Sequence, residues 1–274
     1  MSIRVDGFSF SYGSAHVLDD VCLAPCRPGE VLGLVGPNAA GKSTFLKCVA
    51  GLLRAEGQIW LEGVAVNSRE QWRQLRRQVT YLPQEYASTA AITVFEAVLV
   101  ARQQTASWVV GDDDVEAVAT ILDELRLEPI ALRYLSELSG GQRQMVAVAQ
   151  ALAREPKVLL LDEPTSSLDL QRQLELLQLV RSLAAERSMT VLIALHDLNL
   201  AARFADRLVI LDRGRSYADG SPGDVLTEMM LWQVYGIEAR VERDADHVPR
   251  ITPIRSVRDR ACQPGERALA GASA

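Results

Sequence analysis

The segment that most constrains the fold of this chain is VLGLVGPNAAGKSTFLKCVAGLL, residues 31–53. Its apolar start predicts a buried strand, and its second half predicts a helix. Between them, Gly36, Gly41, Lys42 and Ser43 have the Gly-x4-Gly-Lys-Ser spacing of a loop that cradles nucleotide phosphates. The backbone N–H groups of such a loop, with the positive end of the following helix, form an anion site. The sequence therefore predicts a strand–loop–helix unit that binds a nucleotide.

Two carboxylates directly follow another predicted strand, VLLL at residues 158–161. Side chains at the carboxyl end of a parallel strand lie at the sheet edge where open α/β proteins bind their ligands. We expect Asp162 to hold Mg²⁺ together with the Ser43 hydroxyl, while Lys42 reaches the β- and γ-phosphates. Glu163 is aimed differently and is the candidate general base. The structural alternative is that both carboxylates only cap the next segment.

The predicted fold class is α/β, because short apolar strands alternate with helical patterns. Runs rich in Val, Ile and Leu, typical of strands buried on both faces of a parallel sheet, occur at residues 31–35, 79–82, 158–161, 191–195 and 207–211. Residues 3–13 and 17–25 alternate between apolar and polar side chains, which indicates antiparallel strands of a half-buried sheet. The core is thus expected to be a mostly parallel sheet with an N-terminal antiparallel β part.

A helical insert is predicted inside this core, at about residues 90–138, where the strand signal stops. Thr93 and Glu96 have the spacing of a capping box at the start of a helix. A second helix is predicted in residues 112–127, because apolar residues share one face at helical spacing. The residues predicted on this face are Val115, Val118, Ala119, Leu122 and Leu125.

The C-terminal part is predicted to hold a helix after residue 221 and then a hairpin, residues 237–254. Residues 255–274 contain too few apolar side chains to pack and are expected to be disordered. The main domain is expected to span residues 1–236.

Composition excludes several classes of protein. The net charge of −6 argues against a dedicated nucleic-acid binder, and the basic residues Arg69, Arg73, Arg76 and Arg77 are interpreted as the solvated face of a helix. Every long apolar run is interrupted by charge, so no spanning helix is predicted, and the start lacks a signal-peptide pattern. The cysteines at 22, 26, 48 and 262 form no disulfide framework or zinc pattern and are expected to be reduced thiols in a cytosolic protein.

Further polar residues follow predicted strands or open a predicted helix. Gln84 comes just after residues 79–82, and His196 just after residues 191–195, at the same sheet edge. Gly140 and Gly141, in LSGGQ, open a helical stretch whose N-terminus is a second anion site. A flexible turn is the alternative there. One nucleotide has limited room for two helix ends from the same subunit. A second subunit that docks this helix N-terminus onto the phosphates of the first subunit would resolve the problem.

Together these residues resemble the ATP-binding subunits of ABC transporters. GPNAAGKST resembles the Walker A motif, LSGGQ the signature, VLLLDE the Walker B motif and SSLD (166–169) the D-loop. Gln84 resembles the Q-loop glutamine, His196 the switch histidine, and Tyr12 the aromatic residue that stacks on adenine. The match covers residues 1 to about 236 in the family's order, and LSGGQ separates this family from other P-loop ATPases.

The resemblance implies an ATPase that works as a head-to-tail homodimer with two ATP molecules at its interface. It implies catalytic roles for Lys42, Gln84, Glu163 and His196, with Ser43, Gln84 and Asp162 around Mg²⁺. In this scheme Glu163 is the base, His196 contacts the γ-phosphate, and Gln84 links Mg²⁺ and the attacking water to the helical insert. The implied nucleotide-binding residues are Tyr12, Gly36, Pro37, Asn38, Ala39, Ala40, Gly41, Lys42, Ser43, Thr44, Ser139, Gly140, Gly141, Gln142 and Asp169.

A narrower resemblance concerns residues 195–211, 223–236 and the hairpin, which look like the ATPases of importers for iron-siderophores, haem or cobalamin. It implies integral-membrane permease subunits as partners, a substrate-binding protein as an indirect partner, and a peripheral location on the cytoplasmic face of the inner membrane. The alternatives are an importer subunit for another small solute or a metal ion, an export subunit, an ABC ATPase without a transport role, and a P-loop kinase.

Two residues depart from the family pattern. Ala39 stands where Gly is usual, and a methyl group costs on the order of 1 kcal/mol if the position needs a positive φ. That cost is tolerable in a loop held by several N–H groups and Lys42. Met145 stands where Arg is frequent and is expected to alter packing rather than chemistry.

Overall fold

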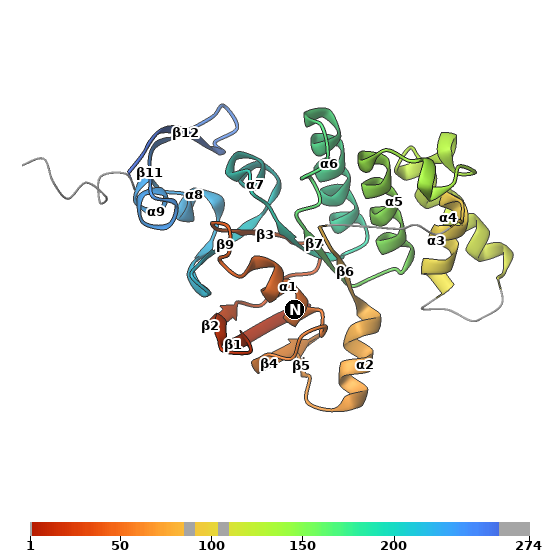
Figure 1. The fold of residues 1–274 in the computed structure, drawn as a ribbon, viewed down its shortest axis with the longest axis horizontal. Helices are drawn as coiled ribbons and strands as arrows, with labels where there is room; N and C mark the ends of the chain where they lie inside the picture. Colours follow the sequence, from red (N-terminus) through yellow and green to blue (C-terminus); the bar gives the residue numbers. More distant parts are fainter. Residues whose placement is uncertain (1, 85–90, 104–109, 258–274) are drawn as a thin grey trace, which may run out of the picture.

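The computed structural model describes residues 2–84, 91–103 and 110–257, which form two sheets, a group of helices and a C-terminal hairpin (Figure 1). The strands are β1 (Ile3–Tyr12), β2 (Ala15–Leu23), β3 (Val31–Val35), β4 (Glu56–Leu61), β5 (Val64–Ala65), β6 (Val79–Leu82), β7 (Val158–Asp162), β8 (Thr190–Ala194), β9 (Arg207–Asp212), β10 (Arg215–Gly220), β11 (Ile237–Arg243) and β12 (Pro249–Ser256). The α-helices are α1 (Lys42–Val49), α2 (Arg69–Gln78), α3 (Val94–Gln103), α4 (Asp112–Glu124), α5 (Gly140–Ala153), α6 (Leu170–Glu186), α7 (Leu198–Phe204), α8 (Pro222–Val225) and α9 (Glu228–Met230). Short helical turns of other types are η1 (Glu128–Ile130), η2 (Leu135–Glu137) and η3 (Leu231–Tyr235).

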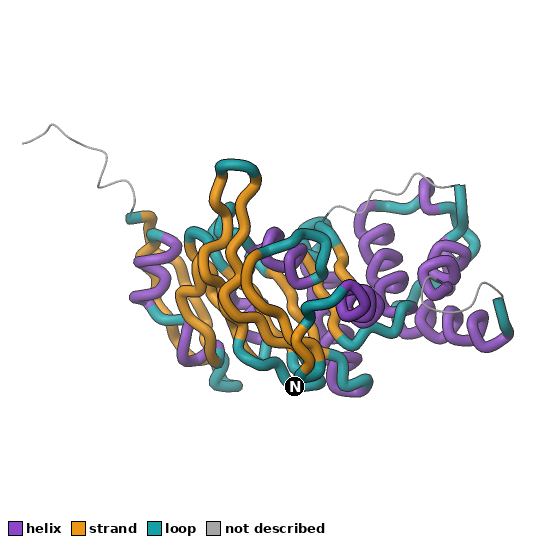
Figure 2. The backbone as a smooth tube through the Cα atoms, turned by 90° about the horizontal axis from the view of Figure 1, so that it is seen from below, coloured by secondary structure: helices purple, strands orange, loops and turns teal. Residues whose placement is uncertain are grey.

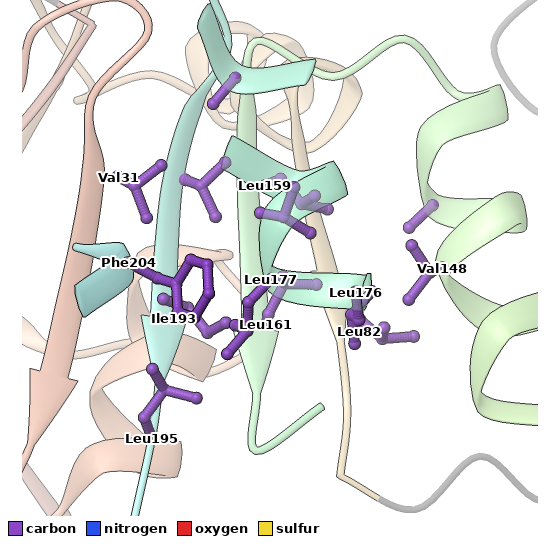
Figure 3. Close-up of a cluster of buried hydrophobic side chains, with 14 of the residues drawn as sticks. Val31, Leu82, Val148, Leu159, Leu161, Leu176, Leu177, Ile193, Leu195 and Phe204 are labelled. Carbon is purple, nitrogen blue, oxygen red and sulfur yellow. The ribbon is translucent and has the colours of Figure 1, made fainter. Parts of the chain in front are cut away.

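The central sheet has the order β10-β9-β3-β8-β7-β6, and only the pair β10–β9 is antiparallel. Every residue of β3, β7 and β8 is buried, as expected for parallel strands covered on both faces. On one face, Leu161 and Ile193 belong to the same hydrophobic cluster as Leu176 and Leu177 of α6 (Figure 3). The predicted mostly parallel core is confirmed.

The first helix, α1, lies between the central sheet and an antiparallel sheet of order β2-β1-β4-β5. A second hydrophobic cluster contains Phe8 and Leu18 from the antiparallel sheet, Phe45 and Leu46 from α1, and Leu160 from β7. The rings of Phe8 and Phe45 meet edge to face, with centroids 6.2 Å apart. This packing fixes the loop before α1 against the ends of the central strands.

The helical insert extends from the sheets at one end of the molecule (Figure 2). The predicted capping box is confirmed: the Thr93 N–H donates to Glu96 Oε2 at 2.7 Å, and the Glu96 N–H donates to Thr93 Oγ1 at 3.3 Å. The predicted buried face of α4 was partly wrong. Val118, Leu122 and Leu125 are buried, but Val115 and Ala119 are exposed. Ile121 is buried instead, because α4 packs on α3 and α5 with a face rotated from the predicted one.

The segment after residue 221 is not the single helix predicted from its pattern. It consists of α8, α9 and η3, with Leu226 and Thr227 between the first two. Leu226 has a non-helical backbone and Thr227 is extended, with its Oγ1 accepting a hydrogen bond from the Met230 N–H, which starts a new helix. The predicted hairpin is confirmed as β11–β12, at the end of the molecule opposite the insert (Figure 1).

The prediction that residues 255–274 are disordered was wrong at its start. Arg255 and Ser256 belong to β12, where they pair with Glu238 and Ile237. Residues 258–274 lie outside the described residues, and so does Cys262. The other three cysteines are free thiols. No helix in the described ranges combines the length and the apolar content needed to cross a membrane.

The basic residues of α2 lie on its solvent-exposed surface, as the sequence indicated. Arg73 pairs with Glu70 one turn earlier on the same helix. The single fully buried residue of α2 is Leu75, which belongs to the second hydrophobic cluster. This helix therefore contributes packing through one face and charge to the solvent through the other.

Candidate functional site

The loop between β3 and α1 has the backbone of an anion site. Gly41, the N-cap of α1, has a φ of 101°, and Ala39 has a φ of 64°, so both are in the left-handed region. A Cβ on Gly36 would lie 2.2 Å from the Leu211 carbonyl oxygen, so only glycine fits. The condition under which Ala39 costs about 1 kcal/mol is therefore met.

Lys42 is the buried cation of this loop, with 5% of its surface exposed. Its Nζ donates hydrogen bonds to the carbonyl oxygens of Gly36 at 2.9 Å and Pro37 at 3.1 Å. Burial lowers the pKa of Lys42, and the negative charges of Glu163 and Asp162 partly oppose this shift. The ammonium group thus lies within the electrostatic reach of both carboxylates.

Asp162, at the end of β7, is buried and accepts a hydrogen bond at each carboxylate oxygen. Ser43 Oγ donates to Oδ1 at 2.9 Å, and the Tyr81 hydroxyl donates to Oδ2 at 2.8 Å. Burial, followed by the charge of Asp162, raises the pKa of Tyr81 above its usual range, which keeps this hydroxyl protonated. The structure therefore brings together Ser43 and Asp162, as the sequence predicted, and adds Tyr81.

Glu163 turns away from Asp162 because its backbone is left-handed, with a φ of 52°. Its carboxylate Oε1 lies 2.5 Å from Nε2 of His196, which follows β8. Its backbone N–H donates to the Ala194 carbonyl oxygen at 3.2 Å, which ties the turn to the neighbouring strand. Two consecutive carboxylates thus have different partners, as expected for a metal ligand and a base.

A cleft of about 290 Å³ lies along the phosphate loop and reaches Glu163, whereas Asp162 and His196 are outside its lining. The residues that line it are Tyr12, Val17, Asn38, Ala39, Ala40, Gly41, Lys42, Ser43, Thr44 and Glu163. Tyr12 is 49% exposed, and its ring stands edge to face against Phe10 with centroids 4.8 Å apart. Gln84 is exposed just beyond β6 and lies outside this lining.

The signature residues lie at the start of α5 and are also outside the lining of the cleft. Ser139 caps this helix: its Oγ accepts from the Gln142 N–H at 3.3 Å, and its own N–H donates to Gln142 Oε1 at 3.0 Å. A Cβ on Gly140 would meet no described atom within 4 Å, whereas one on Gly141 would lie 3.1 Å from Arg172. The predicted second helix N-terminus therefore exists.

Asp169 has a capping role of its own. It is the N-cap of α6, and its Oδ1 accepts a hydrogen bond from the Arg172 N–H at 2.9 Å. The predicted nucleotide-binding set is thus divided between the phosphate loop with its cleft and two helix starts away from the cleft lining.

The residues of the cleft fit a magnesium–nucleotide ligand. In the described part of the chain, no three His, Cys, Asp or Glu residues are grouped as a metal site. Mg²⁺ commonly takes only one or two protein ligands and completes its shell with substrate phosphates and water. A serine hydroxyl and a carboxylate 2.9 Å apart are oxygen ligands of the kind that Mg²⁺ prefers. The adjacent lysine and the helix N-terminus suit the phosphates.

Two tyrosines at the site were not identified from the sequence. Tyr81 reaches Asp162, and the hydroxyl of Tyr235, at the end of η3, hydrogen-bonds the backbone of Gly36. The available signal for Tyr81 was a hydroxyl-bearing residue within a buried apolar strand. For Tyr235 the local sequence offered no such signal, since its contact depends on tertiary packing.

Comparisons with known sequences agree with this chemistry. The sequence profile of the family described as ABC transporter matches residues 21–166. The petrobactin import ATP-binding protein of Bacillus anthracis is 39% identical over 232 residues, covering 84% of this chain and 85% of the relative. The hemin import ATP-binding protein of Rhodococcus jostii is 40% identical over 242 residues, covering 86% and 80%. A phosphonates import ATP-binding protein of a Synechococcus strain is 37% identical over 246 residues, covering 86% and 91%.

Solved structures give the same result. A chain of an inward-facing ABC transporter of the metal-chelate type is similar with a TM-score of 0.78 and 27% identity, covering 93% of this chain and 98% of that chain. A dimeric ATP-binding cassette in a post-hydrolysis state, bound to ADP and Pi, has a TM-score of 0.72 and 26% identity, covering 80% and 98%. With the phosphate loop, Asp162 and Glu163 in place, the chain belongs to the ABC transporter family and is an ATP-hydrolysing subunit of it.

Proposed function

We propose that this chain hydrolyses ATP as a head-to-tail homodimer and drives an importer for an iron chelate, namely a siderophore or haem, or for cobalamin. The observation that carries the homodimer is the separation of the two anion sites. The cleft is lined by the phosphate loop and Glu163, and Asp162 bonds Ser43 of that loop, whereas the capped start of α5 contributes no residue to the lining. A second copy supplying its α5 N-terminus would complete the nucleotide site.

Within one chain, the cleft residues have the following roles. Lys42 exchanges its bonds to two carbonyl oxygens for bonds to the β- and γ-phosphates. Ser43 and Asp162 would hold Mg²⁺, which would neutralise part of the phosphate charge. Tyr12 stacks on the adenine, and Gln84 links the attacking water and Mg²⁺ to the helical insert.

Glu163 is the general base in this proposal. It accepts a proton from water as the water oxygen bonds to the γ-phosphorus and the bond from that phosphorus to the bridging oxygen breaks, giving ADP and phosphate. His196 holds the Glu163 carboxylate in the free protein, where the two side chains are 2.5 Å apart, and contacts the γ-phosphate once nucleotide is bound. Ser139 and Gly141 of the partner subunit bind the same phosphate from the opposite side.

The importer assignment is supported by the relatives of known cargo. Petrobactin and hemin import proteins are 39% and 40% identical to this chain. The chain of a metal-chelate type transporter is similar over 93% of this chain. Integral-membrane permease subunits are the proposed direct partners, and a substrate-binding protein is an indirect one. This chain lies on the cytoplasmic face of the membrane, bound to the permease. A second candidate cargo is a phosphonate, which the relative at 37% identity supports.

The homodimer is tested with Glu163→Gln, which keeps the size of the side chain and removes a proton acceptor. We expect ATP binding to persist, turnover to fall by about 10²- to 10⁴-fold, and a dimer to accumulate with ATP in light scattering. Glu62→Gln, a surface change outside the cleft, is the control and should leave all three properties unchanged. Normal turnover would contradict the role of Glu163, and a monomer at saturating ATP would contradict the dimer.

The same variant tests the transport role. Glu163→Gln with ATP is used as bait in detergent-solubilised membranes, and the co-purifying proteins are identified by mass spectrometry. A permease whose reconstituted complex takes up iron chelates or cobalamin supports the proposal, and one that takes up phosphonates replaces the cargo. Recovery of only non-membrane partners would overturn the importer assignment.

A further inference from the structure

The carboxylate of Asp162 is held by two hydroxyl groups from different elements. Ser43, at the start of α1, donates to Oδ1 at 2.9 Å, and Tyr81, on β6, donates to Oδ2 at 2.8 Å. Ser43 belongs to the phosphate loop and has a role in the proposed metal site. Tyr81 belongs to none of the nucleotide motifs, yet it occupies the carboxylate oxygen that Ser43 leaves free.

The parallel pairing of β6 and β7 explains how Tyr81 reaches this position. Tyr81 is paired with Leu160, and Asp162 lies two residues further along β7 on the same face. The hydroxyl must therefore reach about 6.6 Å along the strand direction. A serine or threonine at this position is too short, whereas a tyrosine carries its donor at the end of a rigid ring.

The ring of Tyr81 is also fixed by its surroundings. Tyr81 and Leu160 pack with the second hydrophobic cluster, which contains Leu46 and Val49 of α1. Ser43, at the start of α1, precedes the residues with which this helix joins the same cluster. Both donors to Asp162 thus come from elements that pack in one cluster, and a hydrogen bond on each oxygen restrains the rotation of the carboxylate.

We propose that Tyr81 is a positioning residue of the metal site, whose hydroxyl orients the Asp162 carboxylate so that Oδ1 and Ser43 Oγ face the metal together. The inference rests on the proposed binding of Mg²⁺ by Ser43 and Asp162. Residues that orient a metal ligand typically change metal affinity by about 10- to 100-fold when they are replaced. Tyr81 does not touch the nucleotide in this proposal, and its effect passes through Asp162.

The test compares the full-length wild type with Tyr81→Phe, which keeps the ring and its packing. Calorimetry measures the affinity of the non-hydrolysable analogue AMP-PNP in Mn²⁺ and in EDTA, and the ratio of the two affinities reports how strongly the metal is held. We expect Tyr81→Phe to reduce this ratio by about tenfold or more, with its affinity in EDTA unchanged. The electron paramagnetic resonance spectrum of bound Mn²⁺ should change as well.

A matched control removes a tyrosine hydroxyl elsewhere. Tyr217→Phe deletes the donor to Gln233, which is outside the cleft lining, and should leave the affinity ratio unchanged. In ATPase assays, raising the Mn²⁺ concentration should restore the wild-type kcat of Tyr81→Phe, since a weakened metal site fills at higher concentration. Thermal melting of the three proteins checks their folding.

The possible results separate the two proposals. A wild-type affinity ratio of one would overturn the metal site itself. A large wild-type ratio that Tyr81→Phe leaves unchanged would overturn the role of Tyr81 alone. An equal loss of AMP-PNP affinity in Mn²⁺ and in EDTA, or a kcat that high Mn²⁺ does not restore, would make Tyr81 a packing residue and also overturn the inference.

Discussion

The two regions that carry the nucleotide motifs satisfy their polar groups in opposite ways. Beside the phosphate loop, Asp162 accepts hydrogen bonds from Ser43 and Tyr81, which are 119 and 81 residues away in sequence. At the start of α5, Ser139 and Gln142 bond each other across three residues. The first region is assembled by tertiary packing, and the second is a local helix cap.

In the proposed homodimer, this difference separates what one chain does alone from what it does in a pair. A site whose carboxylates and lysine are already positioned binds nucleotide within one chain. A locally capped helix N-terminus keeps its geometry without any partner and presents it to whatever docks there. Substitutions in the cleft should therefore change nucleotide binding by the monomer, and substitutions at the start of α5 should change hydrolysis by the dimer.

The largest effect that would test this comparison is expected from Gly140→Asp. A side chain fits at this position in the single chain, and a negative charge is favourable at a helix N-terminus. Opposite the partner's phosphates, the same charge costs several kcal/mol, so ATP turnover should fall by about 100-fold or more. Gly140→Asn introduces a side chain of similar shape without the charge, and its ATP turnover should fall much less. Phosphate release measures turnover, and weakened ATP binding by the monomer would contradict the separation.

A smaller effect, already measurable in the monomer, is expected from Lys42→Ala. Charge-assisted hydrogen bonds are worth about 1.5–3 kcal/mol, so the affinity for a fluorescent ATP analogue should fall by about 10- to 100-fold. Lys157→Ala removes a lysine that is 51% exposed and paired with Glu62, and it serves as the control with unchanged affinity. If Lys42→Ala bound the analogue as the wild type does, the phosphate loop would not be the nucleotide site.

A third effect concerns the helix behind the cleft. Burial raises the pKa of the Cys48 thiol in α1 from 9.0 to about 12. Its contribution to stability is complete below pH 9 and is lost as the pH rises toward 12, at about 1.4 kcal/mol per pH unit. The free energy of unfolding in urea should fall less between pH 8 and pH 10 for Cys48→Ala than for the wild type. The exposed Cys22 provides the control, since the free energy of unfolding of Cys22→Ala should fall as much as that of the wild type.

The smallest effect is expected from Ala39→Gly. Glycine adopts the observed φ of 64° without the cost of about 1 kcal/mol that alanine incurs. Nucleotide affinity should therefore change by less than about tenfold, with hydrolysis by the dimer retained. A complete loss or a large gain of ATPase activity would show that Ala39 has a role beyond loop geometry.

The features that follow from local sequence could be predicted. The phosphate loop, the carboxylates at the end of β7, the start of α5 and the parallel strands are signalled by local sequence, and all are found close to the predicted positions. The hydrogen bond from Tyr81 to Asp162 could not be predicted in the same way, because it depends on which strands are adjacent in the sheet. The rotated face of α4 has the same origin, since α3 and α5 decide which of its residues are covered.

The interruption of the helix after α8 is a third feature that the sequence pattern did not predict. An apolar pattern at helical spacing predicted one helix, but it did not reveal that Thr227 would start a new one. The contact between Glu163 and His196 also joins the ends of two strands, and only their order in the sheet puts them together. Sequence patterns thus predicted the elements that carry the candidate functional residues and the pair Ser43–Asp162, but not the contacts of Tyr81 and Glu163.

The left-handed backbone of Glu163 has a consequence for the evolution of this protein. A non-glycine residue in that conformation costs about 1–3 kcal/mol, and glycine or asparagine would adopt it more readily. Selection for stability alone would therefore favour glycine or asparagine over glutamate at this position. With Glu163 as the proposed base, selection for turnover and selection for stability oppose each other at this residue, and a copy released from selection for turnover should change there early.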